Sequence, residues 1–315
     1  MSVTIHNIRQ AAQRIQPYIH RTPVLTNESL NGKVNAHVFL KCENMQRVGA
    51  FKFRGASNAV FSLTEGEARC GVCTHSSGNH AQALALAARM RGIPAYIVMP
   101  NNAPAVKKQA VAGYGGQITF CEPTLAARET TLANIAERTG AMVVHPYNDE
   151  RVIAGQGTAA LELMEEVSDL DVILAPVGGG GLLSGTSIAA TETQKGIRVI
   201  AGEPEMADDA YRSIQSGTII PSVEPRTIAD GLLTSLGTLT FPIIQQRVEQ
   251  IVTVSEQGIL EAMRFVWERT KIIIEPSAAV AVGVLWEKKI DLAGLRVGVI
   301  LSGGNVDLEK LPWQF

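Results

Sequence analysis

Short apolar runs rich in valine and isoleucine alternate along this chain with longer helical patterns, and this alternation constrains the fold most. Buried parallel strands are almost continuously apolar, whereas helices bury one face. The apolar runs predict strands at 36–42, 71–75, 95–100, 116–121, 141–146, 171–177, 197–203, 250–255 and 296–303. Helical segments between them end on glycine, the usual C-terminal stop, at Gly92, Gly140 and Gly196. The order predicts an α/β fold with parallel sheets covered by helices on both faces.

Composition narrows the class of protein. The chain has 315 residues, 46% of them hydrophobic and 18% charged, which allows one or two domains with a sizeable core. The net charge of −2 gives no reason to expect a nucleic acid or an anionic membrane as partner. No apolar run approaches the roughly 20 residues of a membrane helix, and the first residues form no hydrophobic signal core. We therefore expect a cytoplasmic protein.

The cysteines allow two interpretations. Cys70 and Cys73 have C-x-x-C spacing, which occurs in redox motifs and in halves of zinc sites. Cys42 and Cys121 stand alone, so no second pair has metal-ligand spacing. We favour the other interpretation, in which the 71–75 run is a buried strand and its cysteine is a small apolar residue.

A run of glycines follows the predicted strand 171–177. Gly178 to Gly181 expose bare backbone N–H groups, and a helix beginning near Leu182 offers its positive N-terminal end. Together they form a cradle for an anion, most simply a phosphate. No Walker lysine follows, and Leu183 occupies the third position of a G-x-G-x-x-G pattern. The alternative is a tight turn, although four glycines carry a high conformational entropy cost for that purpose alone.

Two more strand-end loops carry polar groups, and in α/β folds ligands bind beyond the carboxyl ends of strands. Ser76 to Gln82 places hydroxyls, a glycine and an amide at a helix start, which suits a carboxylate. The alternative is an ordinary helix cap by Ser77 or Asn79. After the last strand, Ser302 to Asn305 combines a hydrogen-bonding serine with glycines that allow close approach.

Lys52 lies in the stretch GAFKFRGA, residues 49–56, between Phe51 and Phe53. An amine held among aromatic rings and near other cations has a lowered pKa, and a neutral lysine is a nucleophile toward an aldehyde. Considered alone, a lysine is more often a solvated surface residue. Considered with a phosphate cradle, a carboxylate loop and a strand-end serine, Lys52 suggests pyridoxal phosphate, which needs a Schiff-base lysine, a phosphate site and a partner for its ring nitrogen.

These motifs, in this order, resemble the fold-type II pyridoxal-phosphate enzymes, which have a tryptophan synthase β-like fold. The resemblance covers essentially the whole chain and is strongest to the serine racemases of the serine/threonine dehydratase family. It implies two open parallel-sheet domains: a large cofactor-binding domain of residues 1–64 and 149–315, and a small, mobile substrate-loop domain of residues 65–148. Further segments belong to the same pattern: 21–26, 153–158, 227–232 and 273–278.

The resemblance assigns roles to residues of this chain. The lysine matching Lys52 holds the cofactor and is the base on one face of the substrate, and the serine matching Ser77 is the acid or base on the opposite face. Ser302 matches the residue bonded to the pyridine nitrogen. The other matches are Phe51 beside the ring; Asn79 at the ring hydroxyl; Gly178, Gly179, Gly180, Gly181 and Leu182 at the phosphate; and Ser76, Ser77, Gly78, Asn79 and His80 at the substrate carboxylate.

The implied activity is interconversion of L- and D-serine, with elimination of serine and possibly threonine to the 2-oxo acid and ammonia. The two reactions share proton removal by Lys52, so one site supports both. The alternative within this class is a serine/threonine dehydratase or a threo-3-hydroxyaspartate ammonia-lyase without significant racemase activity. Arg128 matches an arginine near the active-site mouth of serine racemases, and arginine suits a substrate side-chain carboxylate.

The resemblance also bears on two further ligands, a divalent cation and a regulatory nucleotide. Glu203, Asp209 and the backbone carbonyl of Ala207 match a cation site, for which oxygen ligands favour Mg²⁺, with Ca²⁺ or Mn²⁺ as alternatives. An acidic helix N-terminus is the competing interpretation. A homodimer is expected. Animal relatives bind a nucleotide at the dimer interface, but Glu28 of this chain would repel phosphates, so strong nucleotide activation is not predicted.

Two other classes of protein fit the sequence less well. A dinucleotide oxidoreductase would use the glycine run, but the missing third glycine and the lack of an acidic ribose ligand other than Glu203 oppose it. A non-catalytic amino-acid sensor on the same fold would not need Lys52, Ser77 and Ser302 together.

Overall fold

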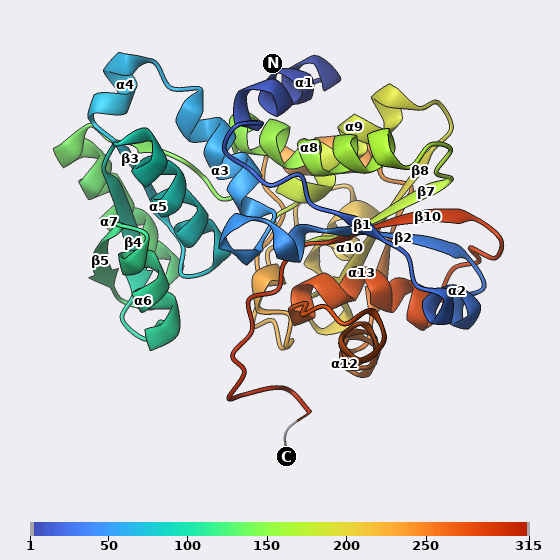
Figure 1. Ribbon diagram of the computed structural model, residues 1–315. Helices are drawn as coiled ribbons and strands as arrows, with labels where there is room; N and C mark the ends of the chain where they lie inside the picture. Colours follow the sequence, from blue (N-terminus) through green and yellow to red (C-terminus); the bar gives the residue numbers. More distant parts are fainter. Residues whose placement is uncertain (1–2, 314–315) are drawn as a thin grey trace.

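Two open β-sheets form the framework of the structure, a computed structural model that describes residues 3–313 (Figure 1). The larger sheet has the strand order β1-β2-β10-β7-β8-β9, and the smaller one β5-β4-β3-β6. All neighbouring strands are parallel except β1, which pairs antiparallel with β2. The strands are β1 Val24–Leu25, β2 His37–Cys42, β3 Val72–His75, β4 Ala95–Pro100, β5 Gln117–Cys121, β6 Met142–Val143, β7 Val172–Pro176, β8 Arg198–Pro204, β9 Gln250–Val254 and β10 Arg296–Leu301.

Every apolar run that predicted a strand contains one, so the predicted α/β class is confirmed. Two differences are local. β6 covers two residues of the predicted 141–146, because the His145 ring accepts hydrogen bonds from the backbone N–H groups of Tyr147 and Asn148 and the chain turns there. The two-residue strand β1 was not predicted, since so short a run has no recognisable period.

The helices alternate with the strands. They are α1 Ile5–Ile15, α2 Glu28–Val34, α3 Lys52–Phe61, α4 Glu65–Arg69, α5 Asn79–Arg91, α6 Ala105–Gly113, α7 Leu125–Thr139, α8 Glu150–Glu166, α9 Gly181–Thr193, α10 Asp209–Ser216, α11 Thr240–Arg247, α12 Glu256–Phe265 and α13 Pro276–Trp286. Short 3-10 turns are η1 Glu43–Met45, η2 Arg47–Gly49, η3 Glu205–Ala207 and η4 Asp230–Leu232, and a π-helical turn, η5, covers Val266–Thr270.

Glycine stops were predicted correctly at two of the three helices. Gly92 and Gly140 cap α5 and α7 with φ of +73° and +70°, a left-handed conformation that favours glycine. The predicted stop at Gly196 is wrong: α9 ends at Thr193 and is capped by Gln194 in an extended conformation. Gly196 instead has φ of +87° in the turn before β8.

Helices cover both faces of the larger sheet (Figure 1). On one face α2, α12 and α13 bury an apolar cluster that includes Leu40, Val252 and Val280. On the other, α1, α8, α9 and α11 bury a second cluster against β7 and β8. The smaller sheet is enclosed in the same way by α5 on one face and α7 on the other. Helix α3 packs against both α5 and α8, so it lies between the two sheets.

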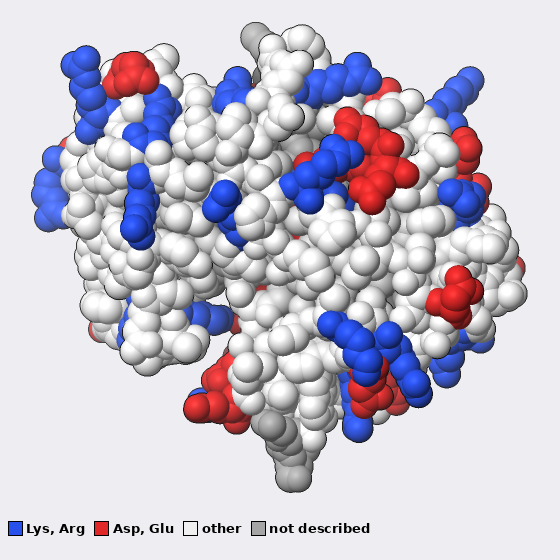
Figure 2. All heavy atoms as spheres, viewed as in Figure 1, with Lys and Arg blue, Asp and Glu red and all other residues white. Residues whose placement is uncertain are grey.

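The surface carries no large field of one charge. In Figure 2 basic and acidic side chains are interspersed over the visible face, and a notch separates the lobe of the smaller sheet from the rest. Within residues 3–313, no helix is long and apolar enough to cross a membrane.

Candidate active site

The Lys52 segment and the Ser302 loop lie side by side, although 250 positions separate them in the chain. Strand β10 pairs with β2, with Leu301 opposite Cys42, so their carboxyl ends meet at one edge of the sheet. The N–H of Phe51 donates to the Ser302 carbonyl at 3.0 Å, and an isolated bridge joins Ala50 to Gly303. Two of the predicted cofactor-binding segments are thus fixed against each other.

The amine of Lys52 is held in a largely apolar setting. Its Nζ donates to the carbonyl of Pro146 at 2.8 Å and lies 5.0 Å from the centroid of the Phe51 ring. Burial lowers the pKa of Lys52 to about 8, while the charge of Glu275 acts in the opposite direction. The predicted lowered pKa is confirmed in direction. Its predicted cause is corrected, because burial and not nearby cations lowers it, and the charged neighbour is an anion.

The glycine loop leads directly into α9. Gly180, with φ of +86°, precedes the first helical residue, Gly181, and no side chain caps the helix. The ring of Tyr147 packs against the loop so closely that a Cβ at Gly179 would lie 2.3 Å from it. The loop therefore needs glycine for steric reasons, and it still presents uncapped backbone N–H groups at a helix N-terminus. Tyr147 follows Pro146, so one short segment contacts both Lys52 and this loop.

Glu275 is a site residue that the sequence analysis missed. Its buried carboxylate accepts hydrogen bonds from the Asn79 side chain at 3.0 and 3.2 Å and from the Asn305 N–H at 3.1 Å. The Asn305 amide also donates to Asn79 Oδ1 at 2.9 Å, so the 76–82 loop and the 302–305 loop share one network. Burial raises the pKa of Glu275 to about 7. The available signal was an acidic residue inside the apolar run before Pro276.

The loop from Ser76 to His80 borders open space. Ser77 is partly buried, and a Cβ at Gly78 would have no atom within 4 Å, so room remains there for a ligand. The side chain of His80 instead points inward: its Nε2 is 3.1 Å from the Val144 carbonyl. Burial lowers the pKa of His80 to about 3, so the ring is neutral. A contact of His80 with a carboxylate would therefore come from its backbone N–H.

Two further histidines lie in this region and were not singled out from the sequence. The rings of His75 and His145 are 6.2 Å apart, and His145 meets Tyr147 edge to face at 4.5 Å. Burial lowers the pKa of His145 to about 4, and burial together with the charge of Arg128 lowers that of His75. Arg128 is partly buried and its charge acts on His75, while its Nε donates to the Thr124 carbonyl at 3.4 Å. The missed signal was that His75 is the last residue of a predicted strand run and His145 the last but one.

Glu203 and Asp209 come together at the end of β8 and the start of α10. The Glu203 carboxylate accepts hydrogen bonds from the N–H groups of Ala210 and Tyr211 at 2.8 and 2.7 Å. Burial raises the pKa of Glu203 to about 8, and burial also raises that of Asp209. Asp209 Oδ2 is buried without a hydrogen-bond partner, and Ala207 is buried in η3 between the two carboxylates. In residues 3–313 no group of three or more His, Cys, Asp or Glu has metal-binding geometry.

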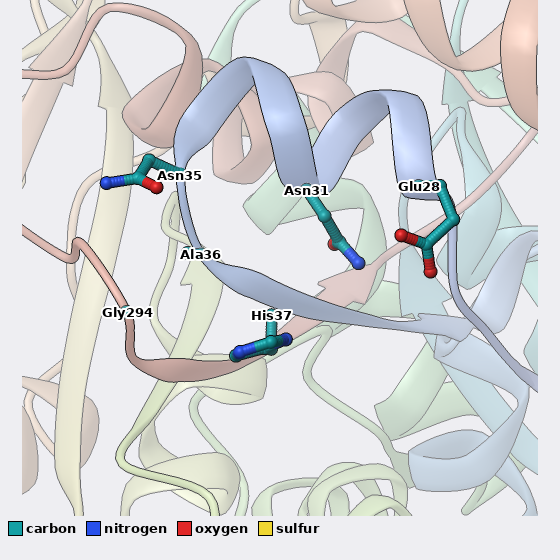
Figure 3. A pocket seen from close by; sticks show the side chains of 6 residues that line it. All are labelled: Glu28, Asn31, Asn35, Ala36, His37 and Gly294. Carbon is teal, nitrogen blue, oxygen red and sulfur yellow. The ribbon is translucent and has the colours of Figure 1, made fainter.

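The cysteines and the surface pockets lie outside this constellation. All four cysteines are free, and Cys73 is buried in β3, where burial raises its pKa to about 11. Cys73 is therefore a small apolar residue of a buried strand, as the favoured interpretation of the sequence has it. A surface pocket of about 280 Å³ between α2 and the start of β2 contains none of the predicted site residues; Asn31 and Glu28 point from the helix toward His37 (Figure 3).

The residues described fit pyridoxal phosphate. A partly buried amine of lowered pKa, Lys52, meets the aldehyde requirement, and the uncapped start of α9 suits the phosphate. Ser302 is buried at the end of β10, beside Phe51, where a hydroxyl can meet a ring nitrogen. Asn79 is bonded into the same edge of the site.

Comparisons with known proteins agree with this chemistry. The family model described as pyridoxal-phosphate dependent enzyme matches residues 15–303. A β-hydroxyaspartate dehydratase of Paracoccus denitrificans is 51% identical, over 99% of this chain and 99% of its own. A serine racemase of Dictyostelium discoideum is 50% identical, over 98% of this chain and 97% of its own. The crystal structure of serine racemase from Dictyostelium discoideum superposes with a TM-score of 0.95 at 50% identity, over 98% of this chain and 100% of that one.

Proposed function

The chain belongs to the family of pyridoxal-phosphate-dependent enzymes, and on that premise we propose that it interconverts L- and D-serine and also eliminates serine to pyruvate and ammonia. The observation that carries this proposal is the Lys52 amine, which lies at the edge where the 302–305 and 76–80 loops meet. Its lowered pKa of about 8 leaves roughly a tenth of the amine neutral at pH 7. The similarity to serine racemases over nearly the whole chain supports the same activity.

The roles of the residues follow from that arrangement. Pyridoxal phosphate, when bound, withdraws electrons from the α-carbon of the amino acid and so acidifies its α-hydrogen. Lys52 then accepts the α-proton on one face, and the hydroxyl of Ser77 donates a proton on the other to invert the centre. The start of α9 holds the phosphate, Ser302 bonds the ring nitrogen through a neutral hydroxyl, and Phe51 packs beside the ring. The 76–80 loop binds the substrate carboxylate.

The segment 65–148, which contains the whole smaller sheet, carries that loop, and we assign it the role of a mobile lid over the cofactor. Closure brings Ser77 toward the substrate and excludes water from the reactive species. The functional unit in this proposal is a homodimer acting on small hydroxy amino acids.

A second candidate, a 3-hydroxyaspartate ammonia-lyase, is favoured by Arg128. Arg128 is partly buried and its charge acts on His75, which supports a role in binding a second substrate carboxylate. The relative that is 51% identical is named as a β-hydroxyaspartate dehydratase, which supports this candidate.

One incubation separates the candidates. Purified holoenzyme with Mg²⁺ receives L-serine or threo-3-hydroxyaspartate, and D-serine is followed by chiral chromatography while 2-oxo acid is measured in the same tube. We expect D-serine together with pyruvate. Formation of 2-oxo acid without D-serine would make the protein an ammonia-lyase. The substrate that is converted faster would then show whether it acts on serine or on 3-hydroxyaspartate.

Changing Ser77 to Ala tests the assignment of the two faces. Ser77→Ala should lower D-serine formation from L-serine by about 100-fold, the scale of a lost acid–base catalyst, and spare elimination from L-serine. Racemisation that survives in this variant would overturn the role of Ser77.

A divalent cation, most simply Mg²⁺, completes the proposal. The buried oxygen of Asp209 without a partner and the raised pKa values of both carboxylates support a bound cation between Glu203, Asp209 and the Ala207 carbonyl. Such an ion would stabilise the junction of β8 and α10.

A further inference from the structure

A buried network of two cations and two anions lies beneath the helix that begins with Lys52. Arg54, Lys41 and Glu43 have side chains that are 0% exposed, and that of Glu162 is 12% exposed. Buried charges are costly to desolvate, so their retention as a fully paired group calls for an explanation beyond stability.

Arg54 uses every hydrogen of its guanidinium in this network. Nε and Nη2 donate to Glu43 at 2.7 and 2.8 Å, and Nη1 and Nη2 donate to Glu162 at 2.8 Å each. The fifth hydrogen bond runs from Nη1 to the Thr158 hydroxyl at 3.2 Å. Two bidentate pairs fix the plane of the guanidinium in direction as well as in position.

The partners of Arg54 belong to the framework of the larger sheet. Glu43 follows β2, and Thr158 and Glu162 lie on α8. Lys41 of β2 donates to Glu162 at 2.7 Å and to the Thr22 carbonyl at 2.7 Å, which closes the network onto the strand. Burial opposes ionisation of Glu162, yet the hydrogen bonds and charge of Arg54 hold the pKa of Glu162 below its usual value.

Geometry connects this network to Lys52. Two positions along an α-helix correspond to about 200°, so Arg54 and Lys52 point in nearly opposite directions from the first turn of α3. Meanwhile α3 also contributes Phe53 and Ala56 to the apolar core of the smaller sheet, against α5. Without a polar anchor, a movement of the smaller sheet would carry α3 with it.

We propose that Arg54 is a positioning residue, which fixes the first turn of α3 to the larger sheet so that Lys52 keeps its place while the substrate loop moves. The inference rests on the proposed role of Lys52 as the base. Because both racemisation and elimination begin with proton removal by Lys52, both depend on Arg54 in the same proportion. Arg54 acts through the helix and touches no substrate.

The test compares two variants. Arg54→Lys keeps the positive charge but loses both bidentate pairs, and Thr158→Val removes one hydrogen bond and no charge. Arg198→Lys is the matched control, since Arg198 forms a bidentate pair with Glu249 at 2.8 and 2.8 Å at the far end of β8. The readouts are kcat and KM for D-serine and for pyruvate, the melting temperature, and the pH dependence of Lys52 acylation in cofactor-free protein.

We expect Arg54→Lys to lower kcat for both products together, by roughly 10- to 100-fold, with KM changed less than about threefold, because a displaced base weakens the chemical step. The midpoint of Lys52 acylation should shift upward from about 8, since a loosened amine reaches water. Thr158→Val should show a smaller loss of kcat and a smaller shift of the acylation midpoint, and Arg198→Lys should change neither quantity.

Two outcomes would overturn the inference. A lower melting temperature with unchanged kcat and an unchanged acylation midpoint would show that the network only stabilises the fold. A change in the ratio of D-serine to pyruvate would place the effect on the opposite face, away from Lys52. If Arg54→Lys does not fold, Thr158→Val decides by the same measurements. A wild-type acylation midpoint near the ordinary lysine value of about 10 would instead refute the proposed function.

Discussion

At the scale of single residues, the surroundings of Lys52 determine its chemistry. A lysine on a solvated surface is almost entirely protonated at neutral pH and cannot act as a base. Here burial lowers its pKa to about 8, while the charge of Glu275 limits the shift. Glu275 itself has a pKa near 7 and bonds Asn79, so the site contains two groups that titrate close to neutral pH.

The lowered pKa of Lys52 predicts how acylation and stability of the cofactor-free protein depend on pH. Site-resolved acylation of Lys52, followed by mass spectrometry, should be half-maximal near pH 8, because only the neutral amine reacts. Since the folded pKa of about 8 is below the unfolded value of 10.5, the unfolded state binds more protons between these two values. The free energy of unfolding should therefore rise with pH across that window, relative to Lys52→Met. A difference in unfolding free energy between wild type and Lys52→Met that does not change with pH would contradict this assignment. Acylation that is half-maximal near pH 10 would contradict it as well.

At the scale of elements, the functional groups lie where strands end and helices begin. The start of α9 needs glycine because Tyr147 packs against it, and the start of α5 places Asn79 against Glu275. The start of α10 is different, since a strand residue, Glu203, caps its first N–H groups. That end holds two buried carboxylates, and it is where we propose that a cation binds.

The β8–α10 junction predicts a thermal shift with magnesium. Saturating Mg²⁺ should raise the melting temperature of the wild type by roughly 5 °C, the expected size for a ligand that binds only the folded state. Glu203→Gln should abolish the increase, because it removes one of the two charged ligands. Glu205→Gln is the control, since Glu205 is exposed in the same segment. An equal increase in Glu203→Gln and wild type would place the cation elsewhere.

At the scale of the whole molecule, an ion pair connects the lobe of the smaller sheet to the lobe of the larger one. Lys107 of α6, in the smaller sheet's lobe, donates to Asp230 of η4 at 2.6 Å. Both side chains are partly exposed, at 31% and 56%, so the pair contributes little to stability. The pair can still affect the separation of the two lobes, because it joins one lobe directly to the other.

Lys107→Gln should shift the protein toward open conformations without a measurable loss of melting temperature. Hydrogen exchange in the 76–80 loop should accelerate by about two- to fivefold, which corresponds to a surface pair of up to about 1 kcal/mol. Arg264→Gln removes a comparably exposed pair, between α12 and the η5 turn that directly follows it, and is the control. The double variant Lys107→Asp with Asp230→Lys should restore slow exchange, and unchanged exchange in Lys107→Gln would show that the pair does not hold the lobes together.

The sequence by itself determined every strand except β1 and two of the three predicted helix ends, because these depend on local backbone sterics and on short-range hydrophobic periodicity. Each run rich in valine and isoleucine that was predicted to be a strand contains one. The prediction at Gly196 was wrong because a glycine can occupy a turn as well as cap a helix. The roles of Lys52, Ser77 and the glycine loop came from the resemblance, and the structure places Lys52 and the Ser302 loop together.

Only the tertiary structure decided the charge environment of the site. Glu275, the His75 and His145 rings and the network around Arg54 join residues that are far apart in the chain, and no local pattern shows which residues they meet. The physical reason is that a pKa or a buried ion pair depends on which groups come within a few ångströms of one another, and here that is set by the pairing of β2 with β10 and the packing of α3 on α8.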